Sequence, residues 1–284
     1  MKISQFNISN FKVDGGAMFG VVPKTMWGKV YPSDENNLIP LSLKSLVVEA
    51  NGRVVLIDNG IGSKQDAKFM SHVYAFGGEG LLPGLAARGY RAEDVTDVIL
   101  THLHFDHCGG GIFRDSHGKF QLTFPNALYH VSAAQWEWAT HPNSREDDSF
   151  LPENILPMKE LGALHLIESE GELIPGLSLR IFNGHTRGQL IPLISYRGKT
   201  LVFCADLFPF TAQIPLPWIM SYDVEPLKTL QEKEQFLNEA LRGNYILLYE
   251  HDYFADCSRL QLTAKGIRAT EGFSFQQLLK ELNE

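Results

Sequence analysis

Apolar runs that match β-strands recur along the chain and predict much of its secondary structure. Residues 44–58 alternate or run apolar on both sides of Asn51-Gly52, and residues 190–206 do the same around Arg197-Gly198-Lys199. An Asn-Gly pair between two β-rich runs is a strong hairpin signal, and the second segment has the same form, so both are expected to be two-stranded ribbons. Further strands are expected at residues 97–103, 126–132, 177–183 and 245–251.

Helical periodicity is weaker, but four segments show it: residues 80–89, 133–140, 226–243 and 274–284. The segment at 226–243 is amphipathic and stops at Gly243, a residue type common just after helix ends. Strands in groups, with helices between them, predict a mixed α/β (α+β) architecture of sheets covered by helices. No linker or repeat interrupts the pattern, so one domain over residues 1–284 is expected.

Charge and composition argue against several classes of protein. The chain has 25 Lys and Arg against 33 Asp and Glu, a formal net charge of −8, and no basic cluster, so no nucleic acid partner is expected. No apolar run approaches the ~18 residues of a membrane helix, and the N-terminus lacks a secretory apolar stretch, so no membrane partner is expected. The odd number of cysteines (Cys108, Cys204 and Cys257) indicates reduced thiols in a cytoplasmic protein.

A dense cluster of potential metal ligands follows the expected strand at 97–103. Within six residues the chain carries three imidazoles and one carboxylate: His102, His104, Asp106 and His107. If the segment leaves a strand and turns, His102 and His104 share one side while Asp106 and His107 follow the bend. One short peptide can then serve two neighbouring metal positions, and the glycines at 109–111 permit a sharp turn and close backbone approach.

Three more candidate ligands end strand-like runs further along the chain: His185, Asp206 and His251. A lone histidine at such a position is more often a hydrogen-bonded core residue than a ligand. Three of them downstream of the first cluster favour a dinuclear site instead. Five imidazoles and two carboxylates without a thiolate suit zinc, and manganese, cobalt or iron are also compatible with this set.

The run HLHFDH at 102–107 resembles the HxHxDH signature of the metallo-β-lactamase superfamily, and Gly184-His185-Thr186, Asp206 and His251 follow in the order of its remaining ligands. The resemblance implies a four-layer αββα sandwich with a dinuclear metal site at one edge of the sheets. One metal would be held by His102, His104 and His185, and the second by Asp106, His107 and His251, with Asp206 bridging both. Asp58 would orient a ligand histidine, with capping of backbone amides as the alternative.

The segment 14–24 is similar to the branch that contains the quorum-quenching N-acyl-homoserine lactonases and methyl parathion hydrolase. The implied reaction is cleavage of an ester-like bond, a lactone in the first place, by a hydroxide that bridges two divalent metal ions. Asp106 would be the catalytic acid that passes a proton to the leaving oxygen. An organophosphate triester or aryl ester is the alternative substrate. From another class, an iron-dependent oxidoreductase similar to persulfide dioxygenases is the rival interpretation.

Large apolar residues near the ligands suggest a substrate cleft, with core packing as the alternative. Phe19 and Trp218 are the residues expected to contact a small-molecule substrate. Lactonases of this branch carry a Tyr three residues after the bridging Asp, where this chain has Pro209. Tyr222 and His72 are candidates to replace that Tyr. A homodimer is a further expectation from the family.

Overall fold

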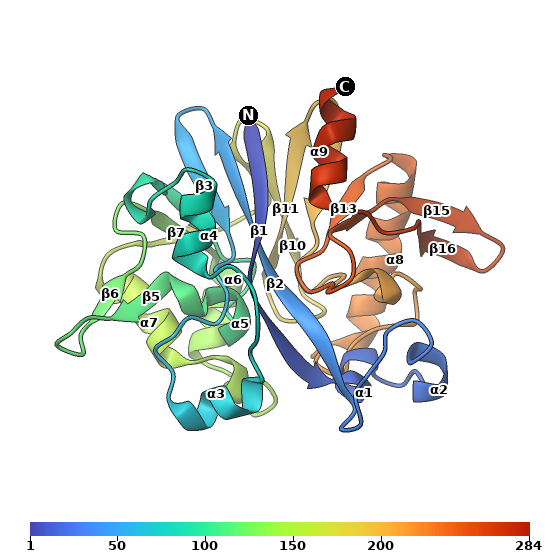
Figure 1. Ribbon diagram of the computed structural model, residues 1–284, viewed down its shortest axis with the longest axis horizontal. Helices are drawn as coiled ribbons and strands as arrows, with labels where there is room; N and C mark the ends of the chain where they lie inside the picture. Colours follow the sequence, from blue (N-terminus) through green and yellow to red (C-terminus); the bar gives the residue numbers. More distant parts are fainter. The chain divides into compact units, whose positions relative to one another are not determined.

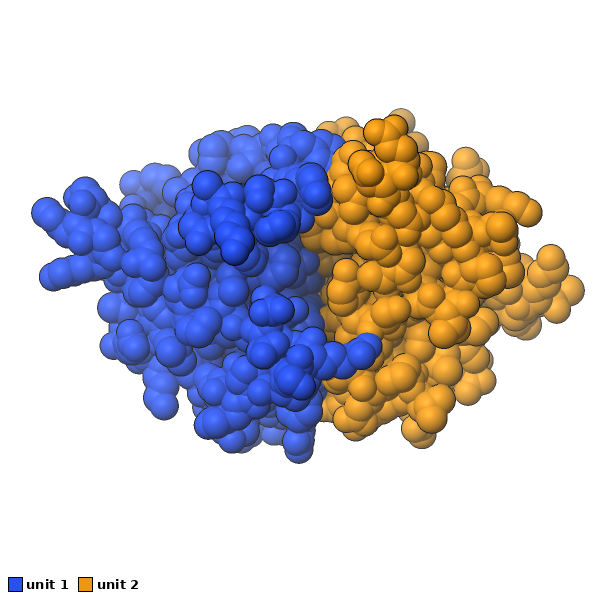
Figure 2. Space-filling model, turned by 90° about the horizontal axis from the view of Figure 1, so that it is seen from below, with its two compact units in different colours: residues 1–10, 43–170, 187–190 blue, residues 11–42, 171–186, 191–284 orange.

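The structure, a computed structural model, describes residues 1–284. The chain divides into two compact units, which Figure 2 colours separately. Unit 1 contains residues 1–10, 43–170 and 187–190, and unit 2 contains residues 11–42, 171–186 and 191–284. Each unit is therefore assembled from separate stretches of sequence. The single domain expected over residues 1–284 stays a prediction.

The first sheet belongs mainly to unit 1 and has six strands in the order β1-β2-β3-β4-β7-β8. Their bounds are β1 Lys2–Asp14, β2 Leu38–Ala50, β3 Arg53–Ile57, β4 Asp97–Ile99, β7 Leu128–Ser132 and β8 Leu164–Ile167. Strands β3, β4, β7 and β8 run parallel to one another, and β3 and β7 are labelled in Figure 1. All three residues of β4 are buried, as is usual for a central parallel strand.

The second sheet belongs mainly to unit 2 and has the order β14-β13-β12-β11-β10-β9. Its strands are β9 Gly171–Ile174, β10 Leu177–Phe182, β11 Gln189–Tyr196, β12 Lys199–Phe203, β13 Ile246–Leu248 and β14 Cys257–Ser258. Because β12 and β13 are parallel, their carboxyl ends lie at the same edge of this sheet. Two small ribbons complete the strands: β5 Ile112–Arg114 with β6 Phe120–Leu122, and β15 Leu260–Thr263 with β16 Gly266–Ala269.

Unit 1 carries the helices α3 Ala67–Val73, α4 Leu81–Ala87, α5 Phe105–Cys108, α6 Ala133–Thr140 and α7 Pro152–Glu160. Unit 2 carries α1 Gly15–Phe19, α2 Lys24–Trp27, α8 Pro226–Arg242 and α9 Phe275–Asn283. Single 3-10 turns occur at η1 Ala92–Asp94, η2 Gly109–Gly111, η3 Asp147–Ser149 and η4 Thr211–Gln213. Helix α6 contacts β7 and β8, and α8 contacts β15 and β16. None of the helices combines the length and apolar character needed to cross a membrane.

Both predicted hairpins are confirmed, and their turns explain why the sequence signal was reliable. Strands β2 and β3 pair around Asn51-Gly52, where φ is 53° and 73°. Strands β11 and β12 pair around Arg197-Gly198, where φ is 52° and 73°. Two successive residues with positive φ match the twist of the flanking strands, and Asn and Gly adopt that conformation at low cost.

The four expected helices are present as α4, α6, α8 and α9, within a few residues of their expected ends. Helix α9 begins with a capping box, since Ser274 Oγ accepts from the Gln277 amide and the Gln277 side chain accepts from the Ser274 amide. Strand β1, with 13 residues, was not expected. Its buried positions do not alternate strictly, so the period of two that marks a half-buried strand is absent.

Candidate metal centre

In unit 1, the HLHFDH run begins just past the carboxyl end of β4 and turns into α5. His102 precedes the turn, His104 is the residue before the first helical position, and Asp106 and His107 lie within α5. The ring centroids of His102 and His104 are 4.5 Å apart, and those of His102 and His107 are 4.0 Å apart. The strand-to-helix turn thus gathers three imidazoles at one place.

Asp58 lies directly behind this cluster and is completely buried. Its Oδ2 atom is 3.1 Å from His107 Nδ1 and accepts from the Thr101 hydroxyl at 2.6 Å. Its Oδ1 atom accepts from the Thr101 amide at 2.8 Å. The carboxylate therefore contacts a histidine ring and also binds a backbone amide, and its role toward a metal ligand stays a prediction.

The glycines after the histidine run allow two backbones to touch. A Cβ atom added at Gly109 would lie 1.9 Å from the Ile61 carbonyl oxygen, and one at Gly110 would lie 2.1 Å from the Asn59 carbonyl oxygen. The Gly110 amide donates to the Gly60 carbonyl, and the Asn59 amide donates to the His107 carbonyl. The ligand-bearing turn is thus fastened to residues 59–62, which follow β3.

In unit 2, the three later candidates lie at strand ends and meet one another. Asp206 follows β12, His251 follows β13, and His185 follows β10. Asp206 Oδ2 is 3.1 Å from His185 Nε2, and Asp206 Oδ1 is 3.1 Å from His251 Nε2. One carboxylate therefore contacts two imidazoles, one through each oxygen.

The charges of this group control its protonation. Burial alone would raise the pKa of Asp206, but the neighbouring His251 and His185 outweigh it and hold the pKa well below its usual range. Burial alone would lower the pKa of His185, but the carboxylates of Asp206 and Asp223 raise it to about 10. These neighbouring charges therefore favour the ionised carboxylate at Asp206.

Each of the five histidines has an oxygen on one ring nitrogen. The pairs are His102 Nδ1 with Thr101 Oγ1 at 3.1 Å, His104 Nε2 with Glu146 Oε1 at 3.3 Å, His107 Nδ1 with Asp58 Oδ2 at 3.1 Å, His185 Nδ1 with Asp223 Oδ1 at 3.0 Å, and His251 Nδ1 with the Ser42 carbonyl at 2.9 Å. A ring that donates a hydrogen bond through one nitrogen presents a lone pair on the other. Metal-binding histidines are held in this way, so the donor set of each unit fits a divalent ion.

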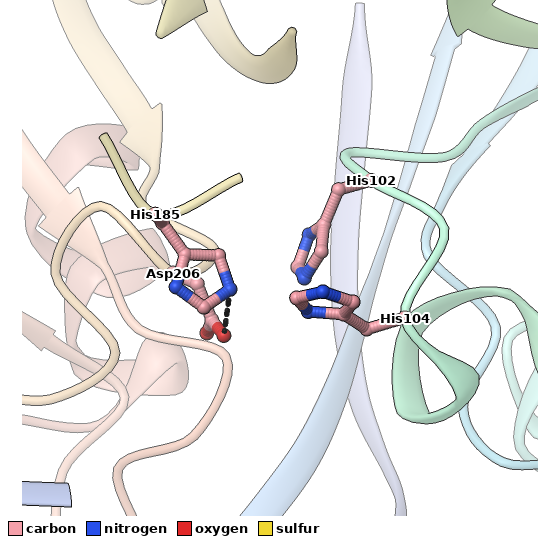
Figure 3. A group of neighbouring side chains, drawn as sticks. All are labelled: His102, His104, His185 and Asp206. Carbon is pink, nitrogen blue, oxygen red and sulfur yellow. Dashed lines mark ion pairs between the residues drawn. The ribbon is translucent and has the colours of Figure 1, made fainter. Parts of the chain in front are cut away.

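Figure 3 draws two of the candidate pairs. In unit 1 the imidazoles of His102 and His104 are nearly perpendicular, with 83° between their planes. In unit 2 the ion pair joins His185 to Asp206. All four side chains are buried and belong to the residue types that bind zinc and related ions.

The two residues expected to contact substrate differ in exposure. Phe19 has no exposed surface and stacks on Trp27, with ring centroids 5.0 Å apart. Trp218 is only half buried and packs edge-on against Phe19 at 5.7 Å. The burial of Phe19 favours the packing role that was the alternative, whereas Trp218 is accessible. Substrate contact by either residue stays a prediction.

The residues considered for the missing lactonase Tyr lie in different surroundings. Pro209 is buried, and its carbonyl accepts from the His251 amide at 3.2 Å. Tyr222 in unit 2 is 45% exposed, and His72 lies exposed on α3 in unit 1. The exposure of Tyr222 and His72 does not indicate that either side chain replaces the lactonase Tyr.

Sequence reasoning missed two carboxylates that contact candidate ligands, Glu146 and Asp223. Both are almost completely buried, with 3% and 2% exposure. Glu146 stands in the run Arg145-Glu146-Asp147-Asp148, which has the composition of a solvated loop. Asp223 lies 38 residues after His185, so no local spacing links the two. An isolated acidic residue in a loop gives no sign of such a role.

Comparison with known proteins extends the resemblance seen in the motif. The family model of the metallo-beta-lactamase superfamily matches residues 40–241. The solved structure of a probable metal-dependent hydrolase from Staphylococcus aureus is 30% identical, with a TM-score of 0.87 over 96% of each chain. A dizinc quorum-quenching lactonase solved with its product superposes with a TM-score of 0.78 over 94% of this chain and 93% of that one, at 20% identity. These agreements confirm the expected fold class, a mixed α/β fold of the metallo-β-lactamase type.

Two sequence relatives bear on activity. A probable metallo-hydrolase of Mycobacterium tuberculosis is 27% identical over 249 residues, which is 75% of this chain and 76% of that protein. An N-acyl homoserine lactonase of a Bacillus species is 36% identical over 106 residues, which is 37% of this chain. This second match spans only 35% of the lactonase. The expectation of a metal-dependent hydrolase is confirmed, and the substrate is a separate question.

Proposed function

The chain belongs to the metallo-β-lactamase superfamily, and on that premise we propose that it hydrolyses a lactone with the help of two divalent metal ions. The observation that carries the proposal is the hydrogen bonding of the five histidines. Each has an oxygen within hydrogen-bonding distance of one ring nitrogen, an arrangement that can hold the ring so that its other nitrogen faces a metal.

The ligand assignment follows the family order. One ion would be held by His102, His104 and His185, the second by Asp106, His107 and His251, and Asp206 would be shared by both. Asp206 supports this role because its two oxygens already face two different imidazoles, those of His185 and His251. Zinc is the proposed ion, because imidazole and carboxylate ligands without thiolate suit it. When bound, two such ions make a water nucleophilic near neutral pH and polarise the bond under attack.

Within this site Asp106 is the proposed catalytic acid. It lies in the first turn of α5, and its side chain is 14% exposed, with Oδ2 3.6 Å from His107 Nε2. Hydrolysis of an ester-like bond leaves an alkoxide that must gain a proton. A carboxyl group beside the reacting atoms can deliver that proton in the transition state.

A lactone is the preferred substrate because of the 36% identity to a homoserine lactonase in the matched segment. Pro209, at the position of the lactonase Tyr, argues that the carbonyl oxygen is contacted differently here. Organophosphate triesters and aryl esters therefore belong in the same assay. The three cysteines are buried and unbridged, which supports work in a reducing compartment such as the cytoplasm. A homodimer stays a prediction.

The test measures metal content and turnover on one sample. Protein purified without added metal is analysed for zinc, manganese, cobalt and iron per chain, and is then assayed on N-acyl homoserine lactones, simple γ-lactones, a phosphotriester and an aryl ester. We expect about two zinc ions per chain and turnover that is highest on a lactone. An Asp206→Ala variant is expected to hold fewer than two ions, because both positions share this residue.

Two results would count against the proposal. Retention of two ions by Asp206→Ala would remove the bridging assignment. A single iron per chain, with oxygen consumed on thiol substrates and no ester cleavage, would favour the oxidoreductase interpretation.

A further inference from the structure

Unit 1 contains a buried carboxylate in a segment whose sequence looks fully solvated. Glu146 lies between α6 and η3 and is 3% exposed, while its neighbours Arg145, Asp147 and Asp148 are exposed. A carboxylate is almost never buried unless its oxygens find hydrogen-bond donors or a positive charge. The contacts of Glu146 therefore indicate why it is turned inward.

Its two oxygens have different partners. Oε2 accepts from the Trp138 indole Nε1 at 2.7 Å and from the Asn143 amide Nδ2 at 2.7 Å. Oε1 faces Nε2 of His104 at 3.3 Å. Two donors thus hold Oε2, and Oε1 faces the imidazole of His104.

The imidazole itself is held from a second direction. The ring of Phe150, four residues after Glu146, lies 4.9 Å from the His104 ring. His104 also packs against the His102 ring at 4.5 Å. The segment 143–150 therefore contacts the His104 ring through both Glu146 and Phe150.

We propose that Glu146 is a positioning residue for His104, and this inference rests on the proposed metal-dependent function. With Nε2–H donated to Glu146, the ring binds a metal through Nδ1. A carboxylate in this place fixes the tautomer and increases the electron density of the ligand nitrogen. The Trp138 and Asn143 side chains act on His104 indirectly, because their hydrogen bonds to Oε2 keep the Glu146 carboxylate from rotating.

The same chemistry recurs at two other candidate ligands. Asp58 faces His107 Nδ1 and also accepts from Thr101, and Asp223 faces His185 Nδ1 and also accepts from the Met220 amide. In each case the carboxylate has donors of its own besides the histidine. Glu146 differs in coming from a loop between two helices, so it can be altered without changing a strand end.

The decisive experiment compares Glu146→Gln with Asp148→Asn. Both variants lose one carboxylate from the same segment, but Asp148 is exposed. A glutamine has one acceptor oxygen where Glu146 uses two, so either the contact to His104 or the contacts to Trp138 and Asn143 are lost. Zinc affinity is measured by competition with a chromophoric chelator, and the visible spectrum of the cobalt-loaded protein reports the ligand geometry.

We expect Glu146→Gln to bind one of two zinc equivalents about 10- to 100-fold more weakly, with a changed cobalt spectrum. Asp148→Asn is expected to have the zinc affinity and the cobalt spectrum of the wild type. Trp138→Phe, which keeps the carboxylate but removes one of its donors, should show a smaller loss and serves if Glu146→Gln does not fold. Circular dichroism of the metal-free proteins separates loss of positioning from loss of structure.

Wild-type affinity and spectrum in Glu146→Gln or, if that variant does not fold, in Trp138→Phe would overturn the positioning role while leaving the metal-dependent function intact. A wild-type protein that binds neither zinc nor cobalt would overturn both proposals.

Discussion

At the scale of single residues, the oxygen behind each imidazole decides which ring nitrogen can bind a metal. His104 contacts an oxygen through Nε2, whereas His102, His107, His185 and His251 contact one through Nδ1. Oxygens placed in this way favour one tautomer of a ligand histidine and hold its ring in orientation. The acidic side chains form two groups. Asp58, Glu146 and Asp223 each contact one ring nitrogen of a candidate ligand histidine. Asp106 and Asp206 are themselves candidate metal ligands.

Asp106→Asn tests the catalytic acid. The amide oxygen can still bind a metal, but the side chain can no longer carry the proton for the leaving oxygen. We expect turnover to fall by roughly 10²- to 10⁴-fold, with metal content and folding retained. Steady-state kinetics, metal analysis and circular dichroism on one preparation check this. Turnover close to that of the wild type would exclude Asp106 as the acid.

At the scale of elements, a buried lysine fastens a loop of unit 2 to a helix. Lys233 of α8 is 1% exposed, and its ammonium donates to the carbonyls of Gln213, Pro215 and Trp218. The loop it holds carries Trp218, the accessible candidate for substrate contact. Burial lowers the pKa of Lys233 to about 7, with Asp223 raising it and Arg268 lowering it further.

The shifted pKa of Lys233 predicts a pH dependence of stability. The folded value of about 7 lies below the ordinary 10.5, so between these values the unfolded chain binds more protons than the native one. The contribution of Lys233 to the free energy of unfolding is therefore lowest below pH 7 and rises above it, by about 1.4 kcal/mol per pH unit. Urea unfolding of the wild type and of Lys233→Met at pH 6 to 9 measures the difference.

The matched control for this loop is Lys228→Met, on the same helix with its side chain 41% exposed. We expect the difference between wild type and Lys233→Met to grow by roughly 2–3 kcal/mol from pH 7 to pH 9. The Lys228→Met difference should stay constant. A Lys233→Met difference that is also constant with pH would show that Lys233 has an ordinary pKa.

At the scale of the whole molecule, metal binding should add to stability because the ligands come from distant parts of the sequence. Residues 102 and 251 are far apart in the unfolded chain, which therefore cannot bind the ions as the native protein does. A ligand present at ~1,000 times its dissociation constant adds about 4 kcal/mol to the free energy of unfolding.

Metal removal therefore predicts a lower melting temperature. For a chain of this size about 4 kcal/mol corresponds to roughly 8–16 °C, which differential scanning calorimetry with and without zinc can detect. Asp206→Ala should recover less of this difference on addition of zinc. Equal melting temperatures for metal-free and zinc-treated wild type would contradict metal binding by the native chain.

Several features of this protein follow from the sequence because their physics is local. The turns at Asn51-Gly52 and Arg197-Gly198 need two residues with positive φ, and Asn51, Gly52 and Gly198 supply that preference themselves. The buried face of α8, at Thr229, Phe236, Leu237 and Ala240, repeats with the period of a helix. The HLHFDH run is local as well, since four potential ligands within six residues are a denser cluster than chance would place there.

Only the tertiary structure decided which charged residues are buried and what they contact. Glu146, Asp223 and Lys233 are charged residues of the kind usually exposed to solvent, yet each is almost completely buried. Their partners His104, His185 and Trp218 lie 42, 38 and 15 residues away in the sequence. Strand β1 likewise forms by pairing with β2, although its own apolar pattern is irregular. A turn or helix is set by neighbours a few residues away, whereas the cost of burying a charge depends on donors and acceptors that the folded chain brings to it.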